Sequence, residues 1–270
     1  MLKPFLKWAG GKRQIVDLLI NNMPKSWNVY IEPFVGSGAL FFRVMPDKAI
    51  ISDINPELMN VYKVIRDNVY ELIKDLEKHE NSSDYYYNIR DNVDLSKMSE
   101  IERASRFIYL NKTCYNGLYR ENSDGKFNVP YGKYKKVKIF DKDNLIKISE
   151  YLNDKDIQIL CSDFENVCGL AGEGDFVFLD PPYYSDGKVS KFTQYNKKTF
   201  DANDHIRLKK VIDELTKRDV YVMHTNSNTD FVLNLYKEYN VKKIYTNRFI
   251  NSDPNNRGKE QYEVIITNYK

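Results

Sequence analysis

The sequence contains little cysteine and little histidine. Its three cysteines, Cys114, Cys161 and Cys168, form no CxxC pair, and their odd number argues against a disulfide framework. The three histidines are scattered and share no metal-ligand spacing. We therefore expect no disulfide-stapled fold and no metal site, and we interpret each histidine as an ordinary surface or core residue.

Long apolar runs and targeting signals are also absent. No run of 18 apolar residues occurs, which excludes a membrane-spanning helix. The first residues, MLKPFLKWAGGKRQ, lack the apolar stretch of a secretory signal peptide. We therefore expect a cytoplasmic protein with no membrane partner. A chain of 270 residues with 42% hydrophobic and 29% charged residues is long enough for one large globular domain, with or without an insertion.

Positive charge is concentrated in one segment. The whole chain has a net charge of +3, but residues 112–138 alone have a net charge of +5 from seven basic and two acidic residues. The same segment contains five aromatic rings, at Tyr115, Tyr119, Phe127, Tyr131 and Tyr134. Basic residues interleaved with stacking rings are typical of a nucleic-acid interface, although a charged run is also compatible with a merely solvated face.

Short apolar runs alternate with helical patterns over much of the chain. We predict strands at 28–33, 48–53, 156–163, 175–180 and 219–225. We predict helices at 12–23, 37–44, 163–171 and 203–218. This alternation indicates an α/β fold in which helices cover both faces of a parallel sheet. The terminal runs VKKIYTNRF and QYEVIITNY predict an antiparallel hairpin at the sheet edge.

The alternation stops between about residues 55 and 150, where helical patterns succeed one another without strands. N-terminal capping signals occur at Asn55 with Pro56, at Asn68 with Glu71 and at Ser99 with Glu102. The stretch GLYRENSDGKFNVPYG then predicts two short strands around Ser123-Asp124-Gly125. We therefore predict a catalytic domain formed by 1–54 and 150–270, with a helical, hairpin-bearing insertion at 55–149.

The stretch FVFLDPPYYSD, at 176–186, ends a buried strand with an acid and two prolines. One interpretation is structural: prolines cannot donate to a sheet, so they stop the strand, and Asp180 caps the segment after it. The other is chemical: the prolines fix a carboxylate, a carbonyl and an aromatic ring in one arrangement, which suits a flat molecule that carries an amino group. The stretch alone does not decide between them.

Two glycine-containing stretches indicate a bound ligand. In YIEPFVGSGALFF, Gly36 and Gly38 lie where the first strand turns toward a helix, but Phe41 replaces the third glycine of a dinucleotide fingerprint. Asp53 ends the next strand, where it could bond ribose hydroxyls, so the pair favours an adenosine-containing ligand that need not be NAD. WAGGK, at 8–12, is followed by Arg13 and so lacks the Ser or Thr of a P-loop. It is either an ordinary helix entry or a second turn over the same ligand.

The order of the motifs carries more information than any one of them. FLKWAGGK, EPFVGSGALFF, SDIN, the insertion and DPPYY succeed one another along nearly the whole chain. In this order the chain resembles the Dam-type DNA adenine-N6 methyltransferases, including those of DpnII-like restriction systems. The resemblance implies a Rossmann-like methyltransferase sheet that uses S-adenosyl-L-methionine, and a DNA-recognition insertion.

The resemblance also implies roles for individual residues. Catalysis falls to Asp180, Pro181, Pro182 and Tyr183. Cofactor contacts fall to Trp8, Ala9, Gly10, Lys12, Glu32, Pro33, Phe34, Gly36, Ser37, Gly38, Asp53, Asp163, Phe164 and Asp180. Among these, the pair at 163–164 resembles the residues that grip the cofactor adenine.

YNGLYR and FNVPYGKYK match the family's DNA-reading hairpin. The implied contacts to double-stranded DNA around GATC are Lys7, Tyr115, Asn116, Leu118, Arg120, Asn122, Pro130, Lys133 and Tyr134. Two departures concern details: Ser185, Asp186 and Gly187 replace the family's usual Pro-Leu-Ser, and Glu121 adds an acid to the hairpin. We expect a monomer, and the sequence does not decide whether a companion restriction endonuclease exists.

The resemblance answers the question raised by the two prolines. Bonds from an adenine amine to the Asp180 carboxylate and the Pro181 carbonyl would orient the nitrogen for methylation, while Tyr183 stacks on a base that has left the duplex. Two alternatives remain open from the sequence. Related acid-or-amide-Pro-Pro-aromatic motifs act on RNA bases, on cytosine N4 or on protein glutamine, and a catalytically silent DNA-binding protein could keep the fold.

Overall fold

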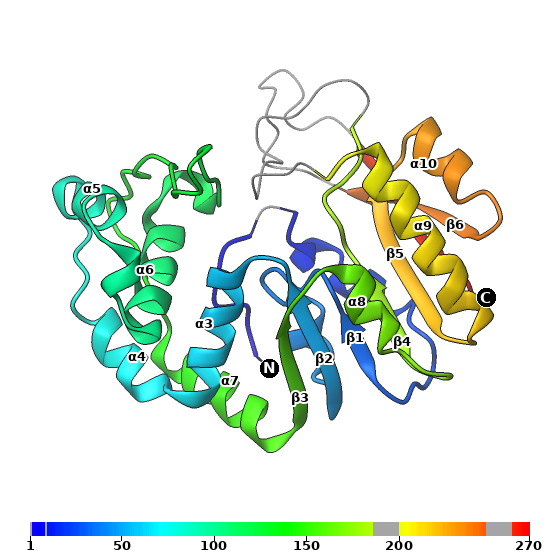
Figure 1. Cartoon of the computed structure of the whole chain (residues 1–270), viewed down its shortest axis with the longest axis horizontal. Coiled ribbons are helices and arrows are strands. Elements are labelled where there is room, and N and C mark those ends of the chain that lie inside the picture. The colour runs from blue at the N-terminus through cyan, green and yellow to red at the C-terminus, as the bar shows by residue number, and fades with distance from the viewer. Residues whose placement is uncertain (1, 9, 186–199, 247–260) are drawn as a thin grey trace.

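The computed structural model describes residues 2–8, 10–185, 200–246 and 261–270. A seven-stranded sheet runs through the molecule (Figure 1). Its strands are β1 (Tyr30–Glu32), β2 (Lys48–Asp53), β3 (Asp156–Cys161), β4 (Phe176–Leu179), β5 (Tyr221–Ser227), β6 (Asn240–Thr246) and β7 (Gln261–Thr267). The five predicted strands and the antiparallel terminal pair are confirmed, whereas the Asp253-Pro254 connection of that pair lies outside the described residues.

The strand order creates one topological switch point. The order across the sheet is β3-β2-β1-β4-β5-β7-β6, with β1 to β5 parallel and β7 antiparallel to both its neighbours. The chain therefore leaves β1 toward one edge and continues from β4 toward the other. In open α/β sheets, ligands bind at the carboxyl ends of the strands at such a point. The segments after β1 and β4 are the ones that carry the glycine motif and the Asp-Pro-Pro-Tyr motif.

Helices cover both faces, as the alternation predicted. They are η1 (Lys12–Gln14), α1 (Val16–Ile20), α2 (Phe41–Val44), α3 (Pro56–Asp67), α4 (Val69–Leu76), α5 (Ser83–Asp91), η2 (Leu95–Lys97), α6 (Glu100–Thr113), η3 (Tyr115–Gly117), α7 (Lys142–Asp154), α8 (Phe164–Gly169), α9 (Ala202–Lys217) and α10 (Asp230–Leu235). One buried cluster packs α2, α3 and α7 on one face, and a second packs α8, α9 and α10 on the other. Figure 1 shows α8 and α9 in front of the sheet.

Two capping signals are confirmed and one is wrong. Asn55 caps α3 through its side chain, and Ser99 forms a capping box with Glu102 on α6. Asn68 makes no side-chain cap on α4, because it also ends α3 and its backbone N–H bonds to Val64. The predicted helix at 37–44 is confined to Phe41–Val44. The reason is that Gly36 and Gly38 have positive φ angles of 48° and 68°, so the chain enters the helix late.

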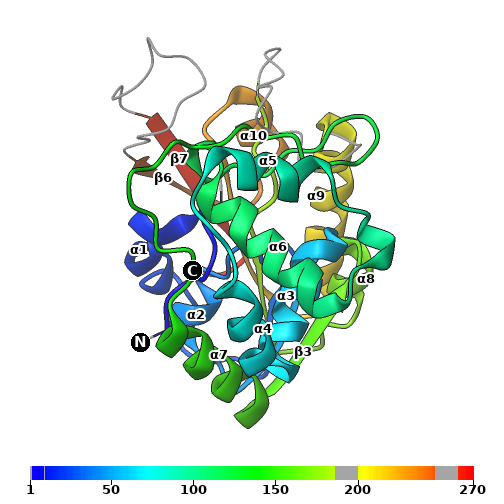
Figure 2. The same ribbon diagram turned by 90° about the vertical axis from the view of Figure 1, so that its left-hand side faces the viewer.

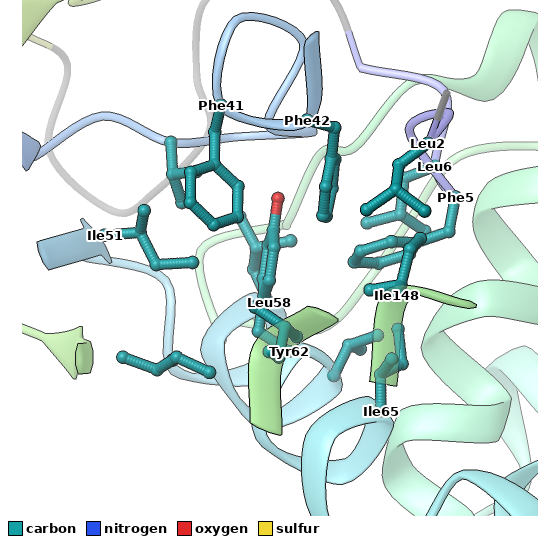
Figure 3. Close-up of a cluster of buried hydrophobic side chains, with 14 of the residues drawn as sticks. Leu2, Phe5, Leu6, Phe41, Phe42, Ile51, Leu58, Tyr62, Ile65 and Ile148 are labelled. Carbon is teal, nitrogen blue, oxygen red and sulfur yellow. The ribbon is translucent and has the colours of Figure 1, made fainter. Parts of the chain in front are cut away.

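A buried tyrosine connects the larger core to the glycine loop. Tyr62 of α3 points its hydroxyl between Phe41 and Phe42 (Figure 3). This hydroxyl donates to the Gly36 carbonyl at 3.0 Å. A Cβ on Gly38 would lie 2.8 Å from the same hydroxyl, so only glycine fits there. The core therefore fixes the shape of the loop after β1.

The inserted segment lies at one side of the sheet, where Figures 1 and 2 show α4, α5 and α6. Its hairpin is less regular than predicted: within the described residues it has isolated bridges between Glu121 and Phe127 and between Cys114 and Tyr131, and no continuous strands. A small core under α5 and α6 includes Tyr86, Tyr109, Leu110, Cys114, Leu118 and Val129. The division into 1–54 with 150–270 and 55–149 stays our prediction. Among the described residues, no helix is long and apolar enough to cross a membrane.

Candidate active site

The acid of the Asp-Pro-Pro-Tyr motif is paired with a lysine from the N-terminal turn. Lys12 Nζ lies 2.7 Å from Asp180 Oδ1, and their side chains are 7% and 18% exposed. Thr225 of β5 also donates to Oδ1, at 2.7 Å. Burial raises the pKa of Asp180, while the contacts with Lys12 and Thr225 lower it. The carboxylate is thus held rigidly just beyond β4, where Oδ1 accepts both bonds.

The ring of Tyr183 is held from two sides. Its hydroxyl donates to Glu263 Oε2 of β7 at 2.8 Å. Lys12 Nζ lies 4.7 Å from the ring centroid, a cation–π distance. Burial raises the pKa of the Tyr183 phenol, and Asp180 and Glu263 raise it further, so the phenol stays protonated and keeps donating. The ring therefore has one orientation relative to the carboxylate.

The loop after β1 is built around close backbone approaches. A Cβ on Gly36 would lie 2.7 Å from Trp8 Cδ1, so the indole edge fills the space that a side chain would need. The Gly36 N–H donates to Asp53 Oδ2 at 3.3 Å, and the Asn55 N–H donates to Oδ1 at 3.0 Å. Burial raises the pKa of Asp53 to about 6, although these N–H bonds lower it. A partly buried carboxylate next to a glycine turn suits hydroxyl groups of a ribose.

A second carboxyl group lies beneath this loop. Glu32 ends β1, is 3% exposed, and accepts a bond of 2.7 Å from the Tyr30 hydroxyl. Burial raises the pKa of Glu32 to about 8, and the charge of Asp180 contributes in the same direction. Glu32 is therefore mostly protonated at pH 7, which makes it a donor as well as an acceptor in this site.

Asp163 and Phe164 lie at the start of α8, where an arginine from α9 engages both. Arg207 donates to the two carboxylate oxygens of Asp163 at 2.8 and 3.0 Å, and its guanidinium lies 4.2 Å from the Phe164 ring centroid. Arg207 lowers the pKa of Asp163 against the effect of burial. Phe34 stacks on Phe164 at 5.4 Å. Two rings and a paired acid thus form the wall beside β1.

The structure brings the predicted cofactor residues to one edge of the sheet. Pro33, Ser37 and Gly38 are buried in the same loop, and the Gly10 carbonyl accepts a 2.6 Å bond from Lys12 Nζ. Ala9, Asp186 and Gly187 lie outside the described residues. The arrangement fits S-adenosyl-L-methionine, because the glycine turn holds Trp8 and Asp53 against the Gly36 backbone, at the same end of the sheet as Asp180. The individual contacts stay predictions.

The predicted DNA-binding residues gather around the hairpin, beside the N-terminal segment. Tyr115 is 46% exposed, and Asn116 has a positive φ of 55°. The Asn116 N–H donates to the Tyr134 hydroxyl at 3.0 Å, and Lys7 Nζ lies 4.4 Å from the Tyr134 ring centroid. The side chain of Asn111 ties the backbone of Lys7 to α6 through bonds of 2.9 and 2.7 Å. The N-terminal segment and the hairpin therefore form one surface.

The remaining hairpin residues differ in exposure. Arg120 donates to Asn128, through Nε to Oδ1 at 2.7 Å and through Nη2 to the carbonyl at 3.3 Å. Asn122 shapes the tip, where its side chain accepts the N–H groups of residues 124 and 126. Pro130 and Lys133 are exposed, whereas Leu118 is only 9% exposed. Leu118 therefore packs in the small core of the insertion.

Four functional neighbours were not predicted from the sequence. They are Arg207, Thr225, Asn226 and Glu263. Each comes from a strand or helix whose only sequence signal is that of an ordinary amphipathic element. Within the described ranges, no group of His, Cys, Asp or Glu could hold a metal ion.

The largely parallel α/β sheet and its strand order are consistent with a Rossmann-like methyltransferase fold. Residues 8–250 match the family model described as D12 class N6 adenine-specific DNA methyltransferase. The chain belongs to this family. It is an adenine-specific DNA methyltransferase that depends on S-adenosyl-L-methionine.

Full-length relatives agree with the family match. The chain is 44% identical to the Type II methyltransferase M1.LlaDCHI of Lactococcus lactis, over 99% of this chain and 96% of the relative. It is 45% identical to the Type II methyltransferase M.MjaIII of Methanocaldococcus jannaschii, over 99% of both. It is 30% identical to the DNA adenine methylase of Escherichia coli K12, over 99% and 95%. These matches favour DNA adenine over the RNA, cytosine and protein substrates left open by the motif.

Proposed function

We propose that the chain methylates adenine N6 within GATC, after the base has flipped from the duplex into a pocket formed by Asp180, Pro181, Pro182 and Tyr183. The observation that carries the proposal is the fixed arrangement beyond β4. Asp180 Oδ1 accepts from Lys12 and Thr225, and the Tyr183 ring is held by Glu263 and Lys12. We assign the Asp180 carboxylate, the Pro181 carbonyl and the Tyr183 ring as the three groups that would hold one planar base and its amine.

The residues of the chain would act mainly by positioning. We assign Oδ2 of Asp180 and the carbonyl of Pro181 as acceptors for the two N–H bonds of the amine, which draws the nitrogen toward tetrahedral geometry. When bound, S-adenosyl-L-methionine supplies an electrophilic methyl group. The proton that N6 loses can pass to Asp180, whose pKa is raised by burial. Holding the reacting groups in place can supply much of the rate enhancement.

The base must leave the duplex, which costs roughly a few kcal/mol. Tyr183 would offset part of this cost by stacking on the flipped adenine, since base–aromatic stacking contributes about 1–3 kcal/mol. A tyrosine bonded through its hydroxyl can stack without rotating, so little side-chain entropy is lost at that step.

The proposed GATC preference rests on the hairpin. It carries the exposed Tyr115, the guanidinium of Arg120 and the basic run after Pro130, and its Tyr134 ring contacts Lys7. Two relatives are named Type II methyltransferases, and for this reason we include a companion restriction endonuclease in the proposal. That the chain acts as a monomer stays a prediction.

The substitution Asp180→Ala tests the catalytic assignment. It should abolish methyl transfer to plasmid DNA while the affinity for duplex DNA changes little, because the carboxylate faces the amine rather than phosphates. Asp213→Asn on α9 is the matched control and should keep normal turnover. Near-normal methylation by folded Asp180→Ala would reject the amine-acceptor role. Methylation-aware sequencing of DNA from cells that express the chain tests the site.

A further inference from the structure

The tetrapeptide 180–183 is anchored at both ends by the same strand. The carbonyl of Leu179, just before it, lies 3.1 Å from His224 Nδ1. The N–H of Tyr184, just after it, donates to Asn226 Oδ1 at 3.1 Å. Asn226 Nδ2 lies 3.2 Å from His224 Nε2, so the two side chains join the two ends through one chain of hydrogen bonds.

The hydrogen-bonding pattern admits one arrangement. The Leu179 carbonyl only accepts, so His224 Nδ1 carries the proton. Burial lowers the pKa of His224 to about 3, so the ring is neutral at pH 7 and Nε2 accepts from Asn226 Nδ2. Oδ1 of Asn226 therefore faces Tyr184 and also accepts the N–H of Ser227, at 2.8 Å. An amide is the side chain that supplies this donor and acceptor together.

The surroundings of this network are buried and partly aromatic. His205 of α9 lies 3.4 Å from Asn226 Nδ2 and has a pKa lowered by burial to about 4. The Tyr236 ring lies 5.0 Å from the His224 ring. Asn226 and both histidines are 0% exposed. The network is therefore part of the buried core next to the motif, where solvent water does not reach its hydrogen bonds.

The two prolines explain why the motif depends on such an anchor. Pro181 and Pro182 have no N–H, so the backbone there cannot donate to a sheet or a turn. The next backbone donors after the prolines are those of Tyr183 and Tyr184. The structure bonds the Tyr184 N–H to Asn226, and Ser227 Oγ donates to the Tyr184 carbonyl at 2.7 Å. The position of Tyr184 therefore fixes where the carboxyl end of the motif lies.

We infer that Asn226 is a positioning residue for methyl transfer, which sets the distance between the Asp180 carboxylate and the Tyr183 ring without touching cofactor or base. This inference rests on the proposed function of Asp180. A further contact from β5 supports this inference: Thr225, the residue before Asn226, donates to the Asp180 carboxylate itself. The end of β5 is thus a template against which the catalytic segment is held.

The substitution Asn226→Ala tests this role, with Asn268→Ala as the matched control. Asn268 bridges the other end of β5: it accepts the Val222 N–H at 2.7 Å and donates to the Val220 carbonyl at 2.8 Å. Both variants lose an amide that bonds the backbone of this strand region, but only Asn226 reaches the motif. The measurements are kcat, KM for S-adenosylmethionine and for a GATC duplex, the single-turnover rate and the melting temperature.

Asn226→Ala should lower kcat and the single-turnover rate by about tenfold to a hundredfold, because small misplacements of reacting groups have effects of this size. Both KM values should stay within about threefold, since ground-state contacts are kept. Asn268→Ala should lower the melting temperature but leave kcat unchanged. An unchanged kcat in folded Asn226→Ala, or equal kcat losses in both variants, would overturn the inference.

If Asn226→Ala does not fold, Ser227→Ala decides the question. It removes the bond to the Tyr184 carbonyl and should lower kcat severalfold at unchanged KM, and an unchanged kcat would overturn the inference. A failure of the catalytic proposal can be distinguished from a failure of the positioning role. An active Asp180→Ala rejects that proposal itself, whereas an inactive Asp180→Ala together with a fully active Asn226→Ala rejects only the positioning role.

Discussion

Lys12 Nζ lies 2.7 Å from Asp180 Oδ1, and both side chains are largely buried. Removing one partner of a buried ion pair leaves the other charge unpaired, which typically costs about 3–5 kcal/mol. We expect Lys12→Met to lower the free energy of unfolding by about this amount at pH 8. Without the cation, the pKa of Asp180 rises further, so the loss should shrink as the pH falls and Asp180 takes up a proton.

Denaturant unfolding at pH 8 and pH 5.5 measures this effect. Lys217→Met is the control, because Lys217 pairs with Glu214 at the surface, where both side chains are more than 60% exposed. Exposed pairs contribute about 0–1 kcal/mol. Equal losses for the two variants, or a loss at Lys12 that does not change with pH, would show that the pair at 12 and 180 is not energetically coupled.

We expect ionised Asp53 to lower the free energy of unfolding, although we predict that the same carboxylate binds the cofactor. Burial raises its pKa to about 6, against an ordinary value near 3.8. A carboxyl whose pKa is raised by folding costs no stability below its unfolded pKa and costs most above its folded pKa. The stability of Asp53→Asn relative to the natural protein should therefore rise between pH 4 and pH 6, by about 1–3 kcal/mol. Thermal unfolding without cofactor, at several pH values, checks this.

The same substitution should weaken binding of S-adenosylmethionine. Loss of a charge-assisted bond costs about 1.5–3 kcal/mol, which corresponds to roughly tenfold to a hundredfold in Kd. Titration calorimetry at pH 7.5 measures it. Asp17→Asn on α1, whose side chain is 77% exposed, should leave the Kd unchanged. Unaltered affinity in folded Asp53→Asn would remove the ribose role.

Much of the site could be predicted because the carboxyl ends of parallel strands lie next to one another in the sheet. The strands β1, β2 and β4 were recognisable in the sequence as short apolar runs, each of which ends near an acidic residue. Parallel strands put their carboxyl ends at one edge, so Gly36, Asp53 and Asp180 had to lie near one another once the strand order placed β1 between β2 and β4. Local signals with a single mechanism, such as the Ser99 capping box, were equally readable.

The partners of the candidate catalytic residues could not be predicted in this way. Thr225 and Asn226 lie on β5, and Glu263 lies on β7. Which face of the sheet each side chain points to depends on the strand register, and a slip of one residue would turn the side chains to the opposite face. The hairpin shows the limit of turn signals: the Asn122 side chain also bonds the tip, and the strands are reduced to isolated bridges. Asn68 fails as a cap because two helices meet at it.

Trp8 should link cofactor binding to the hairpin that we propose to contact DNA. Its indole abuts the Gly36 backbone and stacks on Tyr119 of the hairpin, with ring centroids 5.8 Å apart. Aromatic pairs contribute about 0.5–1.5 kcal/mol beyond their buried area. Tyr119→Leu should therefore weaken S-adenosylmethionine binding about twofold to tenfold, although the hairpin is not assigned any cofactor contact. Tyr131→Leu, which instead loses a contact with Tyr86, should leave the Kd unchanged. Equal effects of the two would contradict the link.

Arg120 is the residue that we expect to read sequence. A planar guanidinium can bond guanine O6 and N7 together, which contributes about 1–3 kcal/mol of discrimination. In the structure Arg120 bonds Asn128, and Glu121 accepts from the Tyr119 hydroxyl. Asn128 therefore holds the guanidinium on the hairpin, and Asn128→Ala should weaken the discrimination in part.

Arg120→Ala should relax the preference at one base pair of GATC, while methylation of the preferred duplex persists. The measurement is kcat/KM on duplexes that carry each single substitution in the site. Lys135→Ala and Lys136→Ala are the matched controls, because both side chains are exposed and lie just after the hairpin. They should weaken all duplexes alike and flatten the salt dependence, as loss of phosphate contacts does. If Arg120→Ala lowers kcat/KM on every duplex by the same factor, Arg120 holds phosphate, and the sequence preference must come from another residue of the hairpin.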